Sequence, residues 1–252
     1  MTPGAGPSGQ PRLGVELAGI PGSGKSRLAR ALAHELSTRG VPVTRPQSAV
    51  GPAIPAVVRI GRKALACGAT AVTAPGPTLR IARAVARSHQ PRTADLAGRL
   101  VQLLLARSVA VRAAAAPGVS IVDEGLVQAL WSIGLRGDVE PALTALESSA
   151  WTRSADLLVV VRVPPELALA RLTARPSRHS RTQLLADGEV LAELQRGARL
   201  LDRLVDWWSE RPGTPQLFEV TGAEEAGDDR ARLLELVCAA VDADRQSGAD
   251  IS

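Results

Sequence analysis

The sequence is short of cysteine, lysine and aromatic residues, and it has no long hydrophobic run. The two cysteines, Cys67 and Cys238, lie far apart and outside any CxxC or Cys/His array, so neither a disulfide framework nor a structural zinc site is predicted. No uninterrupted apolar run approaches the roughly 18 residues that a membrane helix needs, and the first dozen residues lack a signal-peptide pattern. We therefore expect a cytoplasmic protein with no membrane partner.

Lysine is the scarcest cation, since Lys25 and Lys63 are the only lysines among 30 basic residues. The formal net charge is +5, and the basic residues are interspersed with 25 acidic ones rather than gathered in a tail. This balance does not indicate a nucleic-acid-binding surface, so nucleic acid is not an expected partner. The hydrophobic content of 45% is ample for the core of one domain. Whether that domain forms a homodimer is left open.

Short apolar runs alternate with helical patterns along the chain. Strands are predicted at 13–19, 41–46, 119–125, 155–163 and 215–222, and helices at about 25–39, 79–88, 93–116, 182–209 and 228–243. Such alternation is typical of α/β proteins in which helices cover both faces of a parallel sheet. We therefore expect a three-layer α/β/α domain with a five-stranded parallel sheet over residues 13–244, between a tail at 1–12 and a polar tail at 245–252.

Two parts of this pattern are harder to predict. Glu16 lies in a strand that should be buried on both faces, and the sequence offers no reason for a carboxylate there. Residues 47–78 contain prolines at 52, 55, 75 and 77 and many small residues, which predicts loops and at most short helices.

The stretch GIPGSGKS, residues 19–26, follows the first predicted strand and opens the first predicted helix. It matches the phosphate-binding pattern G-x-x-x-x-G-K-[ST] of P-loop NTPases, in the strand-to-helix context that this pattern requires. Its glycines let the backbone turn and present N–H groups to phosphate oxygens, and the helix adds the positive end of its dipole. The predicted ATP-binding residues are Gly19, Gly22, Ser23, Gly24, Lys25, Ser26 and Arg27.

Lys25 and Ser26 would have distinct roles in such a loop. Lys25 is a compact charge for the β and γ phosphates, and Ser26 offers a hydroxyl to Mg²⁺. The planar fork of an arginine cannot replace an ammonium in this cradle, which gives a physical reason for a lysine in a chain that otherwise uses arginine. The alternative is a glycine-rich turn with an incidental lysine.

Asp123 and Glu124 end the third predicted strand. A nucleotide site of this type needs a carboxylate at the end of a neighbouring strand to hold the metal, and Asp123 is predicted to supply it. The alternative is that Asp123 caps the following helix. Glu124 is a candidate general base for an attacking hydroxyl or water, and a solvated first-turn glutamate is the competing interpretation.

Missing motifs exclude two classes of nucleotide-binding protein. GTP-binding switches read guanine with N-K-x-D, and Lys63, the lysine outside the loop, stands between Arg62 and Ala64. ABC-type ATPases need an L-S-G-G-Q-like signature, which the chain lacks.

The stretch PPELALARLTARPSRHSR, residues 164–181, places Arg171 and Arg175 on one face of a helix that follows the fourth strand and that Pro176 should end. With the phosphate loop, T-R-P after the second strand and Asp123, it resembles the P-loop kinases of the nucleoside and nucleotide kinase superfamily, thymidylate kinase in particular. The resemblance implies a lid at 171–182 in which Arg175 and Arg181 stabilise the transferring phosphoryl group. A solvated or RNA-binding basic helix face is the alternative.

The sequence also departs from the thymidylate kinase pattern. Pro21 stands where that family has an aspartate in its phosphate loop, and Asp123-Glu124 stand where it has D-R. Phe218 is the only phenylalanine and there is no tyrosine, so the usual aromatic platform for the base is not evident. We therefore expect the catalytic half to be kept, the substrate half to be altered, and the chain not to be a true thymidylate kinase.

In such kinases the segment between the second and third strands, here 47–118, carries the acceptor site. Arg80 shares one helix face with Arg83 and Arg87 and is a candidate grip on an anionic acceptor, although a solvated stripe explains the spacing equally well. Trp131 is a candidate for stacking on a ring, with a core position as the alternative. Arg45, in the T-R-P stretch, is the third candidate acceptor residue.

Two functions remain. The first is an ATP- and Mg²⁺-dependent kinase that moves the γ-phosphoryl group to a small-molecule acceptor such as a nucleotide, a nucleoside or another metabolite. The second is a regulatory or nucleic-acid-linked ATPase in which Asp123 and Glu124 activate water. The arginine-bearing lid favours the kinase, and the Asp-Glu pair favours the ATPase.

Overall fold

A computed structural model gives the fold and describes residues 12–46, 56–147, 149, 151, 155–174, 187–211, 214–221 and 227–249. Five strands are described: β1 (Arg12–Ala18), β2 (Val43–Thr44), β3 (Gly118–Val122), β4 (Leu157–Arg162) and β5 (Gln216–Thr221). The described helices are α1 (Lys25–Thr38), α2 (Ala56–Thr73), α3 (Pro75–Ala86), α4 (Thr93–Ala115), α5 (Leu126–Gly134), α6 (Glu140–Glu147), α7 (Pro165–Thr173), α8 (Asp187–Ser209) and α9 (Gly227–Ala249).

The strands form one parallel sheet in the order β2-β3-β1-β4-β5. β1 is central and pairs with β3 on one side, where Glu16 lies opposite Val122, and with β4 on the other. Because all strands run the same way, the residues that follow β1, β2, β3 and β4 meet at one edge of the sheet. Any site built from those residues lies at this edge.

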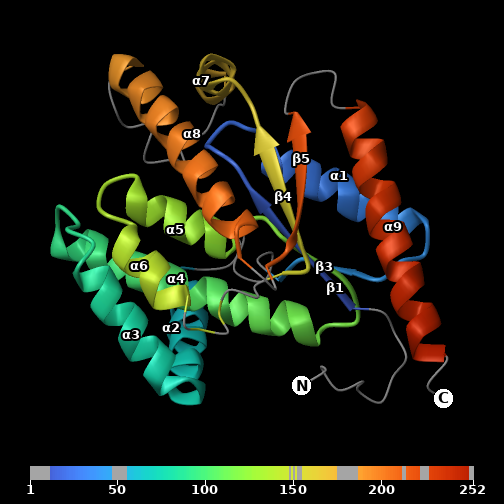
Figure 1. The fold of residues 1–252 in the computed structure, drawn as a ribbon, viewed down its shortest axis with the longest axis horizontal. Coiled ribbons are helices and arrows are strands. Elements are labelled where there is room, and N and C mark those ends of the chain that lie inside the picture. The colour runs from blue at the N-terminus through green and yellow to red at the C-terminus, as the bar shows by residue number, and fades with distance from the viewer. Residues whose placement is uncertain are drawn as a thin grey trace.

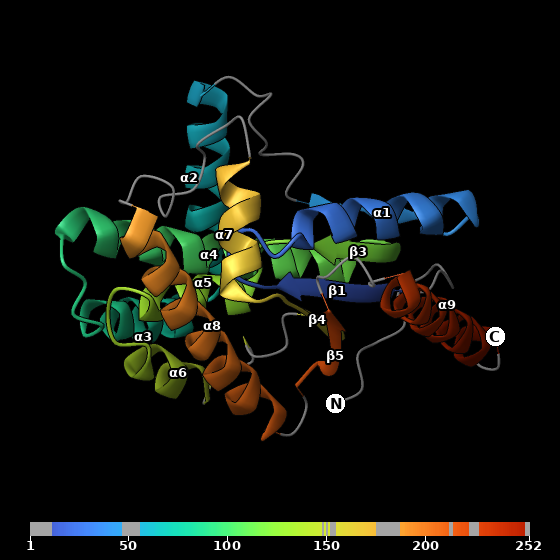
Figure 2. The ribbon, with the colours of Figure 1, turned by 90° about the horizontal axis from the view of Figure 1, so that it is seen from above.

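Helices cover both faces of the sheet, which makes three layers (Figure 1). α1 and α9 pack on one face, where alternate residues of the central strands, such as Val15 and Leu17, join one hydrophobic cluster. α4, α5 and α8 pack on the other, where Ala18 and Ile20 join a second, larger cluster. α2 lies against α4 and projects away from the sheet (Figure 2). The predicted α/β/α fold with a five-stranded parallel sheet is confirmed.

The segment between β2 and β3 corrects one prediction. Over 56–78, where loops and at most short helices were predicted, it contains the 18-residue helix α2 and the first turn of α3, which continues into the helix predicted at 79–88. Pro55 immediately precedes α2, and Pro75 and Pro77 lie in the first turn of α3. A proline in the first helical turn costs little because the N–H that it lacks has no partner within the helix there. The prolines therefore mark helix starts and not loops.

Other differences concern the ends of elements. β2 has two residues where six were predicted, and α9 continues to Ala249 where the sequence pattern ended it near 243. Cys67 and Cys238 are both free thiols. Among the described helices, none is both long and apolar enough to cross a bilayer.

Candidate active site

The phosphate-binding stretch forms a tight loop between β1 and α1. Gly22 has φ of 85°, a left-handed conformation that side chains disfavour, and a Cβ atom there would lie 2.5 Å from the carbonyl oxygen of Ala168 in α7. Gly24 is the N-cap of α1 with φ of 96°. The loop closes on itself through a hydrogen bond of 3.1 Å from the Ser23 N–H to the Ile20 oxygen. The backbone of α7 and the loop thus touch at a place where only glycine fits.

The electrostatics of the loop favour an anion. The first turn of α1 contains no acidic side chain, so nothing in that turn offsets the positive end of the helix dipole. The Lys25 ammonium adds a full charge and donates a hydrogen bond of 3.0 Å to the Gly19 oxygen across the loop. Ser26 and Arg27, in the first turn of α1, are exposed. Fixed N–H groups, a dipole and an ammonium therefore converge at this loop.

Asp123 and Arg45 lie together at the ends of adjacent strands. Asp123 follows β3, Arg45 follows β2, and their side chains form an ion pair with 3.4 Å between Nη2 and Oδ2. The carboxylate is 18% exposed and therefore accessible from the edge of the sheet. Glu124, the next residue, is exposed. The predicted metal ligand and one predicted acceptor residue are thus neighbours.

Arg171 is the site residue that sequence reasoning passed over in favour of Arg175 and Arg181. It lies in the last turn of α7, and its Nη1 is 3.5 Å from the carbonyl oxygen of Ser23 in the phosphate loop. Arg175 and Arg181 lie outside the described residues, so their lid role stays a prediction. The regular spacing of the arginines gave no means of choosing between Arg171 and Arg175.

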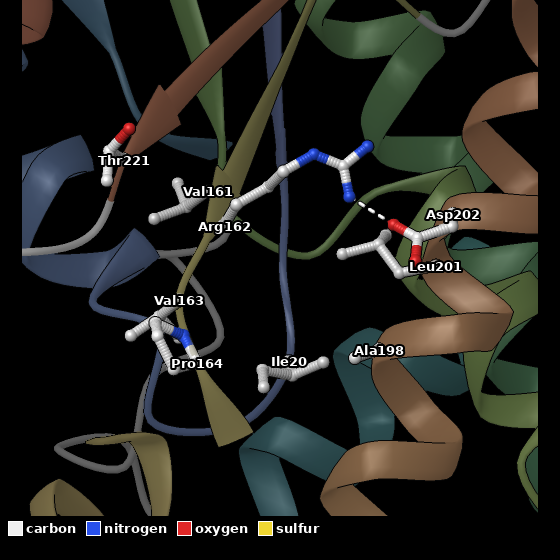
Figure 3. Close-up of a pocket in the computed structure, with 9 residues that line it drawn as sticks. All are labelled: Ile20, Val161, Arg162, Val163, Pro164, Ala198, Leu201, Asp202 and Thr221. Carbon is white, nitrogen blue, oxygen red and sulfur yellow. Dashed lines mark hydrogen bonds and ion pairs between the residues drawn. The ribbon is translucent and has the colours of Figure 1, made fainter. Parts of the chain in front are cut away.

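A pocket of about 250 Å³ opens beside the loop, between the carboxyl ends of β4 and β5 and the middle of α8 (Figure 3). Its walls are mostly apolar and include Ile20 of the phosphate loop and Leu201 of α8. On one side Arg162 forms ion pairs with Asp202 and, at 2.7 Å, with Glu219. The hydrogen bond to Glu219, and then that to Asp202, raise the pKa of Arg162 above its ordinary value although burial opposes them. Its volume lies just below the roughly 300–1,000 Å³ of usual small-molecule sites.

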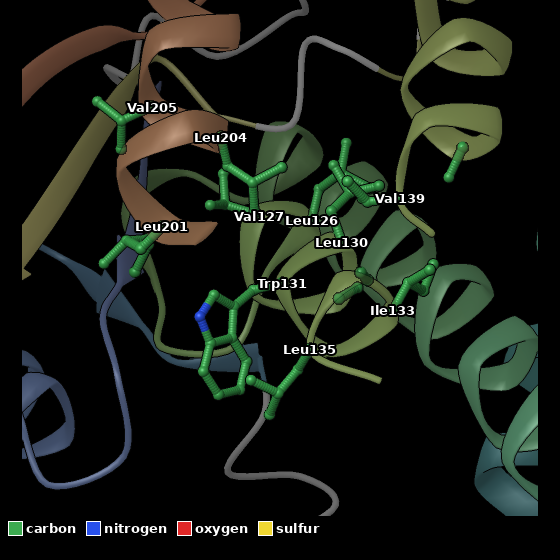
Figure 4. Close-up of a cluster of buried hydrophobic side chains, with 14 of the residues drawn as sticks. Leu126, Val127, Leu130, Trp131, Ile133, Leu135, Val139, Leu201, Leu204 and Val205 are labelled. Atoms are coloured by element: carbon green, nitrogen blue, oxygen red, sulfur yellow. The ribbon is translucent and has the colours of Figure 1, made fainter. Parts of the chain in front are cut away.

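The remaining two acceptor candidates have different surroundings. Arg80 is exposed on α3, on the same solvent-facing side as Arg83 and Arg87. Trp131 is 6% exposed, packs among leucines of α5 and α8 (Figure 4), and donates a hydrogen bond of 2.7 Å from its indole to the Gly197 oxygen. The position of Trp131 supports the alternative that it is a core residue.

The oxygen donors at this edge fit Mg²⁺, which usually takes one or two protein ligands together with waters and phosphate oxygens. The Ser26 hydroxyl and the Asp123 carboxylate are hard oxygen donors that follow adjacent strands β1 and β3. In the parts of the chain that the structure describes, no group of three or more His, Cys, Asp or Glu side chains could hold a metal alone. The donor set therefore suits a cation shared with a nucleotide and not a closed metal cage.

Comparisons with known proteins agree with this fold. No family model matches the chain, and no curated protein matches it. Among solved structures, deoxyadenosine kinase from M. mycoides with bound dATP is similar at a TM-score of 0.51 and 13% identity, over 90% of this chain and 99% of that one. The same enzyme with dCMP and a flexible dCDP gives a TM-score of 0.49 at 12% identity, with the same coverage. At such identity the likeness to the dATP-bound structure establishes a shared fold.

Proposed function

We propose that the chain is an ATP-dependent phosphotransferase that moves the γ-phosphoryl group of ATP to a small-molecule acceptor. One arrangement carries the proposal: a phosphate loop with Lys25, a carboxylate at the end of the adjacent strand, and Arg171 of α7 reaching the loop. Phosphoryl transfer needs little covalent help from a protein and depends on positioning and on stabilising negative charge. Lys25 and Arg171 supply positive charge from two directions, and Asp123, which follows β3 on the other side of β1 from β4 and α7, supplies a metal ligand.

In this proposal the loop N–H groups, Lys25 and the dipole of α1 hold the β and γ phosphates of ATP. Ser26 and Asp123 would hold Mg²⁺, which neutralises phosphate charge when bound. Arg171 lies where a guanidinium can reach the phosphates from the α7 side, because it already contacts the carbonyl of a loop residue. The lid role of Arg175 and Arg181 extends the same arrangement along the chain and is proposed with it.

The proposed acceptor is a nucleoside or nucleotide. The fold is shared with a deoxyadenosine kinase structure, and Arg45 lies beside Asp123 at the edge where an acceptor must meet the γ-phosphate. Arg80 is retained as a more distant acceptor candidate on α3. Glu124 is exposed directly after Asp123 and is the proposed base for the acceptor hydroxyl.

The test measures ATP consumption by the purified full chain, with and without a panel of nucleosides, nucleotides, sugars and other alcohols. A kinase consumes ATP only when a suitable acceptor is present and yields one phosphorylated product per ADP. Fast turnover with no acceptor, or stimulation by RNA or DNA alone, would instead favour the ATPase in which Asp123 and Glu124 activate water.

A further inference from the structure

Glu16, the buried carboxylate that the sequence could not explain, lies on the same face of the sheet as α5. It is 2% exposed, and Ala18 of β1 and Ile20 just after the strand belong to the cluster under α4, α5 and α8. A buried carboxylate is costly unless it is hydrogen-bonded or balanced by positive charge. The groups that contact it therefore indicate its role.

One partner is the beginning of α5. The Glu16 Oε1 atom accepts a hydrogen bond of 2.7 Å from the backbone N–H of Val127, in the first turn of that helix. The N-cap residue of α5 is Gly125, which has no side chain to cap the helix. Glu16 thus replaces the missing cap from a strand 111 residues away, and the positive end of the α5 dipole balances its charge.

The same carboxylate sets the shape of the segment that precedes α5. A Cβ atom on Gly125 would lie 2.2 Å from Cδ of Glu16 and 2.5 and 2.6 Å from its two oxygens. The backbone of Gly125, with φ of −98°, is open to any residue. Glu16, and not the backbone conformation, therefore requires glycine at this position.

Asp123 and Glu124 lie between two parts of the chain that are next to Glu16. Glu16 is opposite Val122 in the β1–β3 register, immediately before Asp123, and it contacts Gly125 and Val127 immediately after Glu124. We propose that Glu16 is a positioning residue that fixes the Asp123–Glu124 segment against β1 and so sets where the metal-binding carboxylate and the general base stand. The effects on kcat and on Mg²⁺ dependence that this inference predicts rest on the proposed function.

Replacement of Glu16 is the first test. Glu16→Ala removes the cap and opens space beneath Gly125, and a catalytic group displaced by about 1 Å can lose about 100-fold in rate. We expect kcat for phosphoryl transfer to fall about 10- to 100-fold, the Mg²⁺ concentration for half-maximal rate to rise, and KM for ATP to change little. Glu16→Gln keeps an oxygen that can accept the Val127 N–H, so its kcat should lie between wild type and Glu16→Ala.

Val15→Ala is the matched control. Val15 is fully buried on the same strand but faces α1 and α9, away from α5. It should lower the thermal midpoint while leaving the kcat of the folded protein and its Mg²⁺ dependence unchanged. If Glu16→Ala behaves in the same way, with loss of stability and unchanged kcat, Glu16 is only a structural residue and the inference is wrong.

Gly125→Ala gives a second, reciprocal test. Alone it forces the new methyl group against Glu16, so we expect it to lower kcat at least as much as Glu16→Ala does. In the double variant Glu16→Ala/Gly125→Ala the collision is gone, and kcat should be no lower than in Glu16→Ala alone. Losses that simply multiply in the double variant would show that the two residues act independently, which contradicts the proposal.

Amide hydrogen exchange of the full chain separates this inference from the proposed function, because it needs no activity. Peptides covering 119–131 should exchange faster in Glu16→Ala than in wild type. In Val15→Ala, any faster exchange should be shared by the peptides that cover β1, so the difference in exchange between those peptides and 119–131 should stay as in wild type. If no acceptor is phosphorylated by the wild type, the proposed function fails and exchange alone decides on Glu16. Unchanged exchange in Glu16→Ala would overturn the positioning role.

Discussion

Gly19 and Gly22 of the phosphate loop and the glycines of α2 have opposite surroundings. A methyl group on Gly22 would meet the backbone of α7, whereas one on Gly61 or Gly68 would meet nothing within 4 Å. The same contrast extends to large side chains, since Leu65 and Val72 of α2 are 75% and 81% exposed. The donor side of the molecule is therefore fixed by close backbone contacts, and the α2 layer is not. Substitutions should separate the two regions sharply.

Lys25→Ala should have the largest effect on activity. Removing a charge that stabilises a transition state typically costs about 100-fold or more in rate, so ATP turnover should fall at least that far while the thermal midpoint stays close to wild type. Lys63→Ala is the control, because Lys63 is the other lysine of the chain and lies on α2, a helix with an exposed face. It should leave ATP affinity unaltered. Equal losses of ATP turnover in Lys25→Ala and Lys63→Ala would contradict the difference between the phosphate loop and α2.

Gly22→Ala should have the largest effect on stability. It combines a left-handed backbone with a contact of 2.5 Å to the Ala168 oxygen, and a side chain forced into that conformation costs about 1–3 kcal/mol. Urea unfolding followed by circular dichroism gives the change in the free energy of unfolding. A loss below about 0.5 kcal/mol would mean that α7 can shift away from the loop at little cost.

Arg171→Ala should reduce phosphoryl transfer by about tenfold, because a hydrogen bond to a charged group contributes roughly 1.5 kcal/mol. The rate of transfer should fall more than the affinity for ATP, which single-turnover kinetics and equilibrium binding measure separately. Arg232→Ala, which changes an exposed arginine on the solvent-facing side of α9, is the matched control. Loss of ATP affinity alone would place Arg171 in ground-state binding and not in transfer.

Gly68→Ala should have the smallest effect and the opposite sign from Gly22→Ala. Glycine within a helix is about 1 kcal/mol less favourable than alanine, and the added methyl group meets open space. The free energy of unfolding should therefore rise by up to about 1 kcal/mol in the same urea experiment. A decrease would show that the exposed face of α2 is covered in solution.

The sequence predicted well those features that depend on local pattern. The phosphate loop, the parallel sheet and the position of Asp123 after β3 all follow from short runs of residue types with a known spacing. α2 was missed because its flanking prolines were taken as breakers, although a proline at a helix start has no such effect.

Features that depend on contacts between residues far apart in the chain could not be predicted from the sequence. Glu16 accepts the N–H of Val127, 111 residues away, and nothing within β1 signals that partner. The sequence pattern predicts Arg171 and Arg175 on one helix face, and the resemblance favoured Arg175. The closeness of Arg171 to Ser23 appears only in the structure. The sequence gives no sign that Gly125 lies against a carboxylate, because Glu16 is 109 residues away along the chain.

The placement of the tryptophans has a spectroscopic consequence. Trp131, Trp151 and Trp208 are buried in the cluster beneath α4, α5 and α8, Trp207 packs against it, and the chain has no tyrosine. The near-ultraviolet emission of the protein therefore comes from one layer, to which the phosphate loop contributes Ile20. A change in emission when ATP is added would report a rearrangement of that layer, sensed through the loop.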